Sequence, residues 1–326
     1  MRYLFTLLLL TGILMTLSFP SWGMHSSGLW FLAPFCLAPF GICLLRRPAN
    51  WLWLLTYYLF ASLWFFLNLY WLWNITFPGT LALSAFVGLY WVLFAFCARR
   101  LIVHLRWPAL AALPLAWVIT EYLRATIFSG FAWFTLGNAL AGAPLLIQTA
   151  DLGGVWLLSF LTAMTSGLLV DLYRLPLRHP SRIMPRLIAL YVLTILSAIG
   201  YGWFRLNQSI TPPELQRAQA APGPRIAVIQ EYIPQSQKDS TDAEEKTALF
   251  NRHIVLSMAA ATLKPDLIVW PETMVPMPIN PDFLGLQGKT EEGAKYFDLA
   301  RSFDVNLKAL TAFSHSYLLV GAPYQD

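Results

Sequence analysis

The residue best placed for chemistry in this sequence is Glu272, an acid that comes directly after a short apolar run. Leu267 to Trp270 is β-branched and aromatic, is too short for a helix and is ended by Pro271, which predicts a buried strand. Glu272 then lies where a strand passes into a loop, a frequent place for a rigidly held catalytic carboxylate. On this segment alone, the alternative interpretation is a solvated loop acid.

Cysteine, the other side chain suited to covalent chemistry, is confined to the first part of the chain. Cys36, Cys43 and Cys97 all lie inside apolar runs, where a thiol behaves as a small hydrophobic group. No cysteine follows residue 97. The later part of the sequence therefore offers no thiol nucleophile, no disulfide and no thiolate metal ligand.

The composition indicates a membrane protein with a soluble portion. Hydrophobic residues make up 57% of the chain and charged residues only 12%, against about 25% in soluble domains. The long apolar runs lie in residues 1–205, while 225–326 has the composition of a soluble domain. Seven apolar stretches are long enough to span a membrane, at about 3–19, 28–45, 51–73, 79–98, 107–128, 150–172 and 186–205. The first stretch could instead be a signal peptide.

Arginine placement predicts the orientation of these stretches. The arginines precede the first stretch or follow the second, fourth and sixth: Arg2, Arg46, Arg47, Arg99, Arg100, Arg106, Arg174, Arg178, Arg182 and Arg186. The gaps 20–27, 74–78 and 129–149 contain no Lys or Arg. The positive-inside rule then places the N-terminus in the cytoplasm and the soluble domain in the periplasm. Topology also accounts for the net charge of +5, and nothing predicts a nucleic-acid partner.

One acid and one arginine lie within a predicted span. Glu121 and Arg124 are three residues apart near its outer end, so on a helix they share a face and could pair. Such residues are candidates for function, and a structural ion pair at a helix end is the alternative. The following gap, 129–149, is rich in Gly, Phe and Trp, which fits either an aromatic belt or a gate for a lipid substrate.

The soluble part is predicted to be an α/β layer. A Pro-rich linker occupies 206–224. After it, the apolar runs at 226–229, 267–270 and 317–320 predict three buried strands. The first two are separated by a helix with capping-box spacing at Thr241 and Glu244, and helical patterns separate the last two. Alternating strands and helices pack as a sheet covered by helices.

The sequence resembles apolipoprotein N-acyltransferase, a bacterial inner-membrane family with a nitrilase-like domain carried on membrane helices. The matching segments are Phe19-Pro20 with Trp30 and Pro34, Tyr70-Trp71, Glu121-Tyr122-Leu123-Arg124, Gly130-Phe131-Ala132-Trp133, Gly153-Gly154-Val155-Trp156, Ile233-Pro234-Gln235 and Trp270-Pro271-Glu272. The resemblance implies a polytopic α-helical membrane domain, 1–205, the linker 206–224, and at 225–326 part of an extracytoplasmic nitrilase-like domain of the αββα type.

The family uses a Glu, Lys, Cys triad, and by resemblance Glu272 is its general base. A cysteine thiolate attacks a phospholipid ester, and the resulting thioester passes its acyl group to the amine of a diacylglyceryl apolipoprotein, while Lys stabilises the oxyanion. The implied partners are therefore the phospholipid acyl donor, the lipoprotein acceptor and the membrane. No cofactor and no metal are implied.

The sequence departs from the family pattern in ways that bear on activity. In the family the Lys and the Cys follow a strand like 317–321. Lys289, Lys295 and Lys308 precede it, and no cysteine follows it. Asp239 stands where the family often has Trp, and Tyr232 where Asn is usual. We therefore expect a chain truncated within its catalytic domain and inactive alone. A membrane anchor or partner subunit derived from the family is the alternative, and a transporter fits less well because the spans hold few charges.

Overall fold

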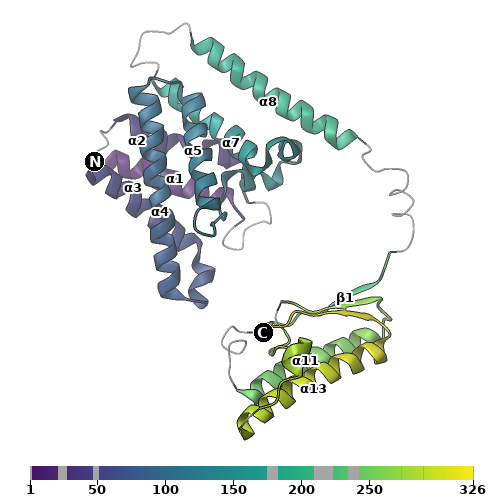
Figure 1. Ribbon diagram of the computed structural model, residues 1–326. Helices are drawn as coiled ribbons and strands as arrows, with labels where there is room; N and C mark the ends of the chain where they lie inside the picture. The colour runs from purple at the N-terminus through teal and green to yellow at the C-terminus, as the bar shows by residue number, and fades with distance from the viewer. Residues whose placement is uncertain are drawn as a thin grey trace. The chain divides into compact units, whose positions relative to one another are not determined.

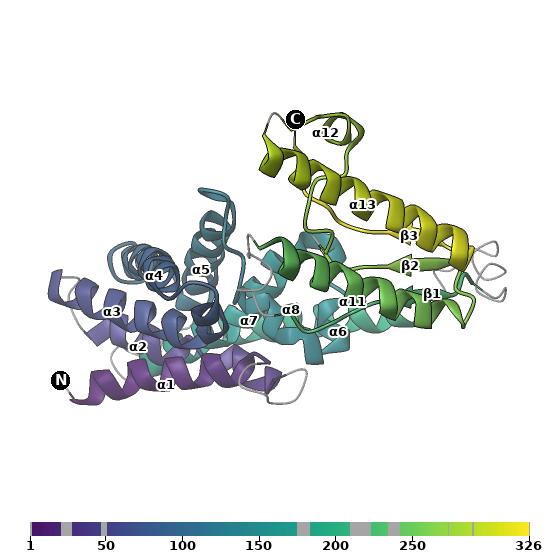
Figure 2. The same ribbon diagram turned by 90° about the horizontal axis from the view of Figure 1, so that it is seen from below.

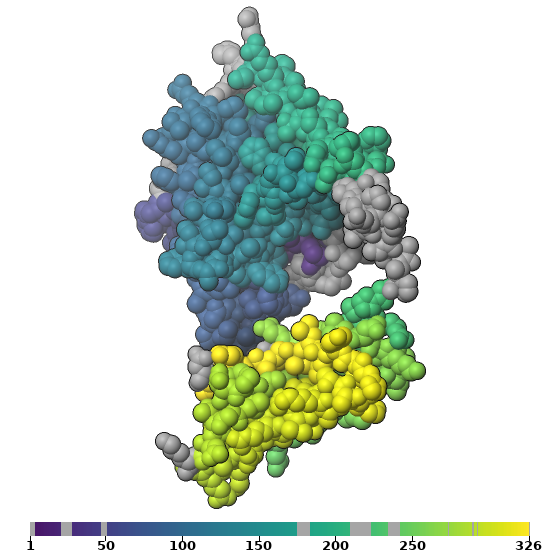
Figure 3. Space-filling view, turned by 45° about the vertical axis from the view of Figure 1, so that its right-hand side comes forward, coloured from purple at the N-terminus to yellow at the C-terminus, as the bar shows by residue number. Residues whose placement is uncertain are grey.

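The chain divides into two compact units, Met1–Ile210 and Thr211–Asp326. A computed structural model describes residues 2–20, 28–46, 51–174, 183–208, 223–233, 242–272, 274–288 and 290–325. The first unit is helical, and the second combines helices with a small sheet (Figure 1). Figure 3 draws the atoms of the second unit in green to yellow. Most of the predicted linker 206–224 lies outside the described residues, as do Arg47, Arg178 and Arg182.

Each of the predicted apolar stretches contains a helix in the first unit. The main helices are α1 (Arg2–Ser18), α2 (Ala38–Arg46), α3 (Trp51–Asn68), α4 (Phe77–Arg99), α5 (Ala109–Thr126), α7 (Ala150–Arg174) and α8 (Met184–Asn207). Shorter helical turns join them: η1 (Trp30–Phe35), η2 (Tyr70–Asn74), η3 (Arg100–His104), η4 (Leu136–Gly142) and α6 (Pro144–Ile147). The helical prediction for 1–205 is therefore confirmed for the described residues.

Four helical segments in the described residues are long and apolar enough to cross a membrane. They are α3, α4 continued through η3, α7 and α8. The apolar segments 4–18 and 30–46 are shorter, and the second is divided between η1 and α2. These helices are consistent with a multi-pass membrane protein. The count of seven spans and the orientation stay predictions.

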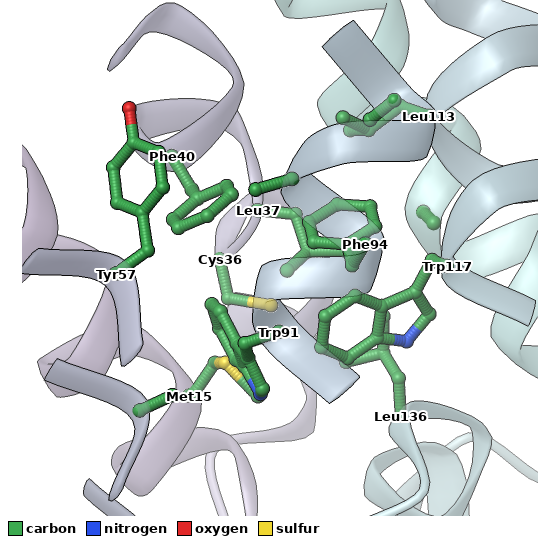
Figure 4. Packing of buried hydrophobic residues seen from close by; sticks show 14 of the residues in the cluster. Met15, Cys36, Leu37, Phe40, Tyr57, Trp91, Phe94, Leu113, Trp117 and Leu136 are labelled. Atoms are coloured by element: carbon green, nitrogen blue, oxygen red, sulfur yellow. The ribbon is translucent and has the colours of Figure 1, made fainter. Parts of the chain in front are cut away.

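Aromatic side chains form much of the core of the first unit. Trp91 and Trp117 meet edge to face at 5.1 Å between ring centroids, and Phe94 lies 4.9 Å from Trp117 (Figure 4). Phe40 stacks on Phe94 at 5.5 Å. The Cys36 thiol is fully buried beside them (Figure 4). Because edge-to-face pairs add to the hydrophobic burial of the rings, this cluster fixes α2, α4 and α5 against one another.

The second unit is a three-stranded parallel sheet with helices on one face. Its elements are β1 (Ile226–Val228), α11 (Ala243–Ala261), β2 (Leu267–Val269), α12 (Pro281–Leu284), α13 (Glu291–Ser314) and β3 (Tyr317–Leu319). The strand order is β1-β2-β3, with β2 in the centre. Figures 1 and 2 show α11 and α13 running beside the strands, and Figure 1 shows both on the same face. The predicted alternation of strand and helix is confirmed.

The N-terminus of α11 differs in detail from the prediction. Its N-cap is Asp242, whose side chain accepts a hydrogen bond of 3.0 Å from the backbone N–H of Glu244. The predicted cap, Thr241, lies outside the described residues. Threonine and aspartate both suit an N-cap, so the sequence alone did not decide whether Thr241 or Asp242 would cap the helix.

The two faces of the sheet have different environments. Ile268, in the central strand, is fully buried in a cluster with Phe250 of α11 and Phe303 of α13. On the opposite face, large apolar side chains of the outer strands are more than half exposed: Ile226, Val228, Tyr317 and Leu319. The described part of this unit thus covers one face of its sheet and leaves the other open.

Candidate active site

Glu272 lies just beyond the carboxyl end of the central strand. The backbone N–H of Trp270 donates to the carbonyl of Leu319 at 2.9 Å, and the N–H of Ile229 donates to the carbonyl of Val269 at 2.9 Å. The ladder therefore continues to Trp270, the residue before Pro271, on the β3 side and to Val269 on the β1 side. In open α/β sheets, ligands bind outside the carboxyl ends of the strands, and Glu272 is at that edge.

Trp270 anchors the segment that carries Glu272. Its side chain is 4% exposed, and its indole N–H donates to the hydroxyl of Ser257 at 2.7 Å. The ring also packs against Phe250 at 5.7 Å and His253 at 5.2 Å between centroids. These three partners lie on one face of α11, at spacings of three and four residues. The helix thereby fixes the residue two positions before Glu272.

The chain is buried again from Met274, two residues after Glu272. Glu272 is exposed, whereas Met274 and Val275 are buried. The N–H of Val275 donates to the carbonyl of Gly321, beyond β3, at 3.2 Å. The glutamate is thus presented at the tip of a short excursion between two buried segments. An exposed carboxylate on a fixed backbone is suited to act as a base toward a group brought to this edge.

A second acid lies at the same edge and was not singled out from the sequence. Glu231 comes three residues after Val228, as Glu272 comes three residues after Val269, and these two strand residues are register partners. Glu231 pairs with Arg252 of α11 at 3.2 Å. Glu231 could have been predicted from the sequence, because like Glu272 it follows an apolar run that predicts a strand.

Other predicted chemical groups lie away from this edge. Cys36, Cys43 and Cys97 all belong to the first unit. Lys295 and Lys308 lie on α13 in exposed ion pairs with Glu291 and Asp304, and Lys289 is outside the described residues. The described residues of the second unit contain no cysteine, and Lys295 and Lys308 pair along α13 with acids of that helix. The described residues also contain no cluster of His, Cys, Asp or Glu able to hold a metal.

The comparisons with known proteins identify the family of the first unit. Residues 11–168 match the family model of the apolipoprotein N-acyltransferase N-terminal domain. An apolipoprotein N-acyltransferase from Sinorhizobium medicae is 31% identical over 184 residues, 55% of this chain and 32% of that protein. One from Geobacter metallireducens is 37% identical over 170 residues, 51% of this chain and 30% of its own length.

A third relative extends the match a little. An apolipoprotein N-acyltransferase from Pseudomonas putida is 28% identical over 211 residues, 64% of this chain and 35% of that protein. The matched part of the chain spans about a third of the length of these relatives. The family model lies within the helical first unit, whose segments at Glu121 and Gly153 also carried the resemblance. Residues 11–168 are therefore assigned to the apolipoprotein N-acyltransferase N-terminal domain family.

Proposed function

We propose that the chain takes part in transferring a fatty acyl group from a phospholipid to the N-terminal amine of an S-diacylglyceryl-cysteine lipoprotein. The single observation that carries this, beyond family membership, is the presentation of Glu272 at the carboxyl edge of β2 by the buried Trp270. In the proposed reaction Glu272 removes the proton of a cysteine thiol. The thiolate then attacks the carbonyl of the phospholipid ester and expels the lysophospholipid, whose alkoxide oxygen takes up a proton. The lipoprotein amine attacks the thioester so formed, which gives the N-acyl amide and releases the cysteine thiol.

The second unit is proposed to be part of a nitrilase-like domain of the αββα type. The support is the sheet itself, which is covered by α11 and α13 on one face while Val228, Tyr317 and Leu319 are exposed on the other. A sheet face with side chains of this size requires a second layer for burial. In the proposed domain a second sheet supplies it.

The thiol and the oxyanion-stabilising lysine are proposed to come from outside these 326 residues. All three cysteines lie in the first unit, and Cys36 and Cys43 are buried in its apolar core. Glu272 therefore has no thiol in its own unit to activate. We propose that this chain alone forms no thioester.

The test compares the 326-residue chain alone with the chain joined to the C-terminal segment of the Geobacter metallireducens relative. Each is placed in phospholipid vesicles with a diacylglyceryl lipopeptide, and acyl transfer is followed by mass spectrometry. We expect no transfer from the chain alone and transfer from the joined chain. In the joined chain, Glu272→Gln should lower the rate by about 10²-fold or more, the usual contribution of a general base.

The matched control is Glu291→Gln, which removes an exposed carboxylate of the same unit that pairs with Lys295 on α13. It should leave the rate unchanged. Transfer by the 326-residue chain alone would refute the proposal that the thiol is external. A joined chain that transfers equally well with Glu272→Gln would refute the role of Glu272, and one that binds both substrates without transfer would refute the function.

A further inference from the structure

Residues 127–135, which we call the aromatic loop, join α5 to η4 with an unusual backbone. Phe128, Ser129 and Phe134 have positive φ angles of 56°, 68° and 59°, and Gly130 has a φ of 77°. Residues other than glycine adopt this region infrequently, and each such residue costs on the order of 1 kcal/mol or more. Three of them in one short loop persist only where the surrounding structure holds them.

Two buried ionisable side chains hold this loop. Glu121 is 3% exposed, and its Oε1 accepts a hydrogen bond of 2.7 Å from the backbone N–H of Leu136. Arg124 is 4% exposed, and its Nη1 donates to the carbonyls of Phe131, at 3.0 Å, and Trp133. The backbone N–H of Phe131 donates in turn to the carbonyl of Arg124 at 2.7 Å. Both ends of the loop are therefore tied to the last turns of α5.

The pairing that helical spacing allows between Glu121 and Arg124 does not form a direct ion pair in the described residues. Among the ion pairs of the described residues, none joins these two side chains. Helical spacing does place them near each other, but the loop carbonyls and the Leu136 N–H lie closer to their charged atoms. Burying an ionisable group without a good partner is costly. The hydrogen bonds of Arg124 to two loop carbonyls and of Glu121 to the Leu136 N–H therefore fix the backbone of the loop.

The fixed backbone determines where the aromatic side chains lie. Phe134 points into the bundle and meets Phe19 and Trp64, each at 5.3 Å between ring centroids. Trp133 packs against Trp71 of η2 at 4.9 Å, while remaining 56% exposed. Phe128 is 77% exposed. The loop is therefore anchored by one ring and presents two others.

We propose that the aromatic loop is a preorganised binding surface for a phospholipid and that Glu121 and Arg124 are its positioning residues. The occupant follows from the surroundings: the loop ends a helix that packs against α4 and α7, both apolar and long enough to span a membrane. Exposed Trp and Phe at such helix ends lie at the level of lipid headgroups and upper acyl chains. An ordinary interfacial belt needs no buried charges and no strained backbone, because single rings adapt to lipid without them. Fixed positions for Phe128 and Trp133 are useful where one lipid must be held in one place.

The inference rests on the proposed function only in identifying this phospholipid as the acyl donor. Contact of lipid with the loop requires no acyl transfer, so the two ideas can fail separately.

The experiment uses the full chain in phospholipid nanodiscs containing a phosphatidylethanolamine with a diazirine on one acyl chain. Photolabelled peptides are mapped by mass spectrometry, and hydrogen exchange of the loop amides is followed in parallel. In the wild type we expect labelling concentrated on 127–135. Arg124→Lys retains the charge but can bond fewer carbonyls, so exchange at Phe131 should rise by about tenfold and loop labelling should fall severalfold. Glu121→Gln keeps an acceptor for Leu136 and should have a smaller effect in the same direction.

A matched control exists on α7. Asp171 and Arg174 have the same three-residue spacing as Glu121 and Arg124, and both are buried. Asp171 accepts from the backbone N–H of Leu110 at 2.9 Å, and Arg174 donates to the carbonyl of Ile102 at 3.3 Å, so this pair holds backbone at the opposite end of α5. Arg174→Lys should leave loop labelling and loop exchange unchanged.

Three results would overturn the proposal: a wild-type loop labelled no more than other helix ends, an Arg124→Lys loop that exchanges and labels as the wild type does, or an equal loss of label in Arg174→Lys. If Arg124→Lys does not fold, Glu121→Gln supplies the same comparison. If loop labelling is as expected but the joined chain transfers no acyl group, phospholipid binding by the aromatic loop is supported. The identification of that phospholipid as an acyl donor is then refuted.

Discussion

Replacing Ser257 with alanine should destabilise the second unit and loosen the segment that presents Glu272. The Ser257 hydroxyl is fully buried and accepts the indole N–H of Trp270, which is itself 4% exposed. Without it the indole N–H has no acceptor and no access to water, which costs about 1–3 kcal/mol. Alanine is the better helix former and returns about 0.5 kcal/mol within α11. The free energy of unfolding should therefore fall by about 0.5–2.5 kcal/mol.

Hydrogen exchange of the full chain in detergent micelles measures this loss locally. The relevant amides are those of 267–270, because the Trp270 N–H is bonded to Leu319 across the sheet and exchanges only when the sheet edge opens. A loss of 0.5–2.5 kcal/mol corresponds to exchange that is about two- to seventyfold faster. Peptides of the first unit should keep their wild-type rates.

Ser302→Ala supplies the control for helix propensity. Ser302 is exposed on α13, and its hydroxyl donates only to the carbonyl of Leu299 at 2.7 Å. The substitution gains the same propensity and removes no buried acceptor, so exchange at 267–270 should be unchanged or slightly slower. Unchanged exchange in Ser257→Ala, or an equal increase in Ser302→Ala, would refute the argument that α11 anchors Trp270 through this hydrogen bond.

Three further changes have outcomes set by packing and backbone geometry. Phe250→Ala removes a fully buried ring from the second unit and should cost about 3–5 kcal/mol, seen as loss of protection throughout that unit. Gly202→Ala would place a Cβ 1.7 Å from the carbonyl oxygen of Leu145 and should therefore separate α8 from α6, which loss of cysteine cross-linking between these helices would measure. Gly200→Ala is the control, because a Cβ there meets nothing within 4 Å and cross-linking should be unchanged. Gly130→Ala, at φ +77° with a carbonyl 2.0 Å from its Cβ, should speed exchange in the aromatic loop.

The strands and helices of the second unit could be predicted closely because each has a local cause. Apolar runs bounded by proline or a turn predicted all three strands to within one residue of their observed ends. The central strand, for example, is Leu267–Val269. The order of strand and helix then required a parallel sheet. The helices of the first unit followed equally from the lengths of the apolar stretches.

The contacts of Glu121 and Arg124 could not be predicted in the same way. Their partners are backbone groups of the loop at Phe131, Trp133 and Leu136, brought within reach by residues with positive φ. Propensity gives phenylalanine and serine no preference for that region, so the sequence contains no signal for the turn. Helical spacing allowed a pairing of the two side chains, whereas their hydrogen bonds go to the loop backbone. His253 was missed for a related reason: its burial against Trp270 depends on tertiary packing.

Glu272 and the aromatic loop, the two exposed features for which we propose functions, are each held in place from a neighbouring helix. A strand of three residues, or a loop with strained backbone, cannot by itself hold a side chain still in water. At the sheet edge, Ser257 holds Trp270, two residues before Glu272. In the helical unit, Arg124 holds the carbonyl of Trp133 itself. In each case a buried polar bond from a neighbouring helix fixes an aromatic residue or its backbone close to the exposed group. It follows that conservative substitutions of the buried helix residues should affect presentation of the exposed groups before they affect the fold.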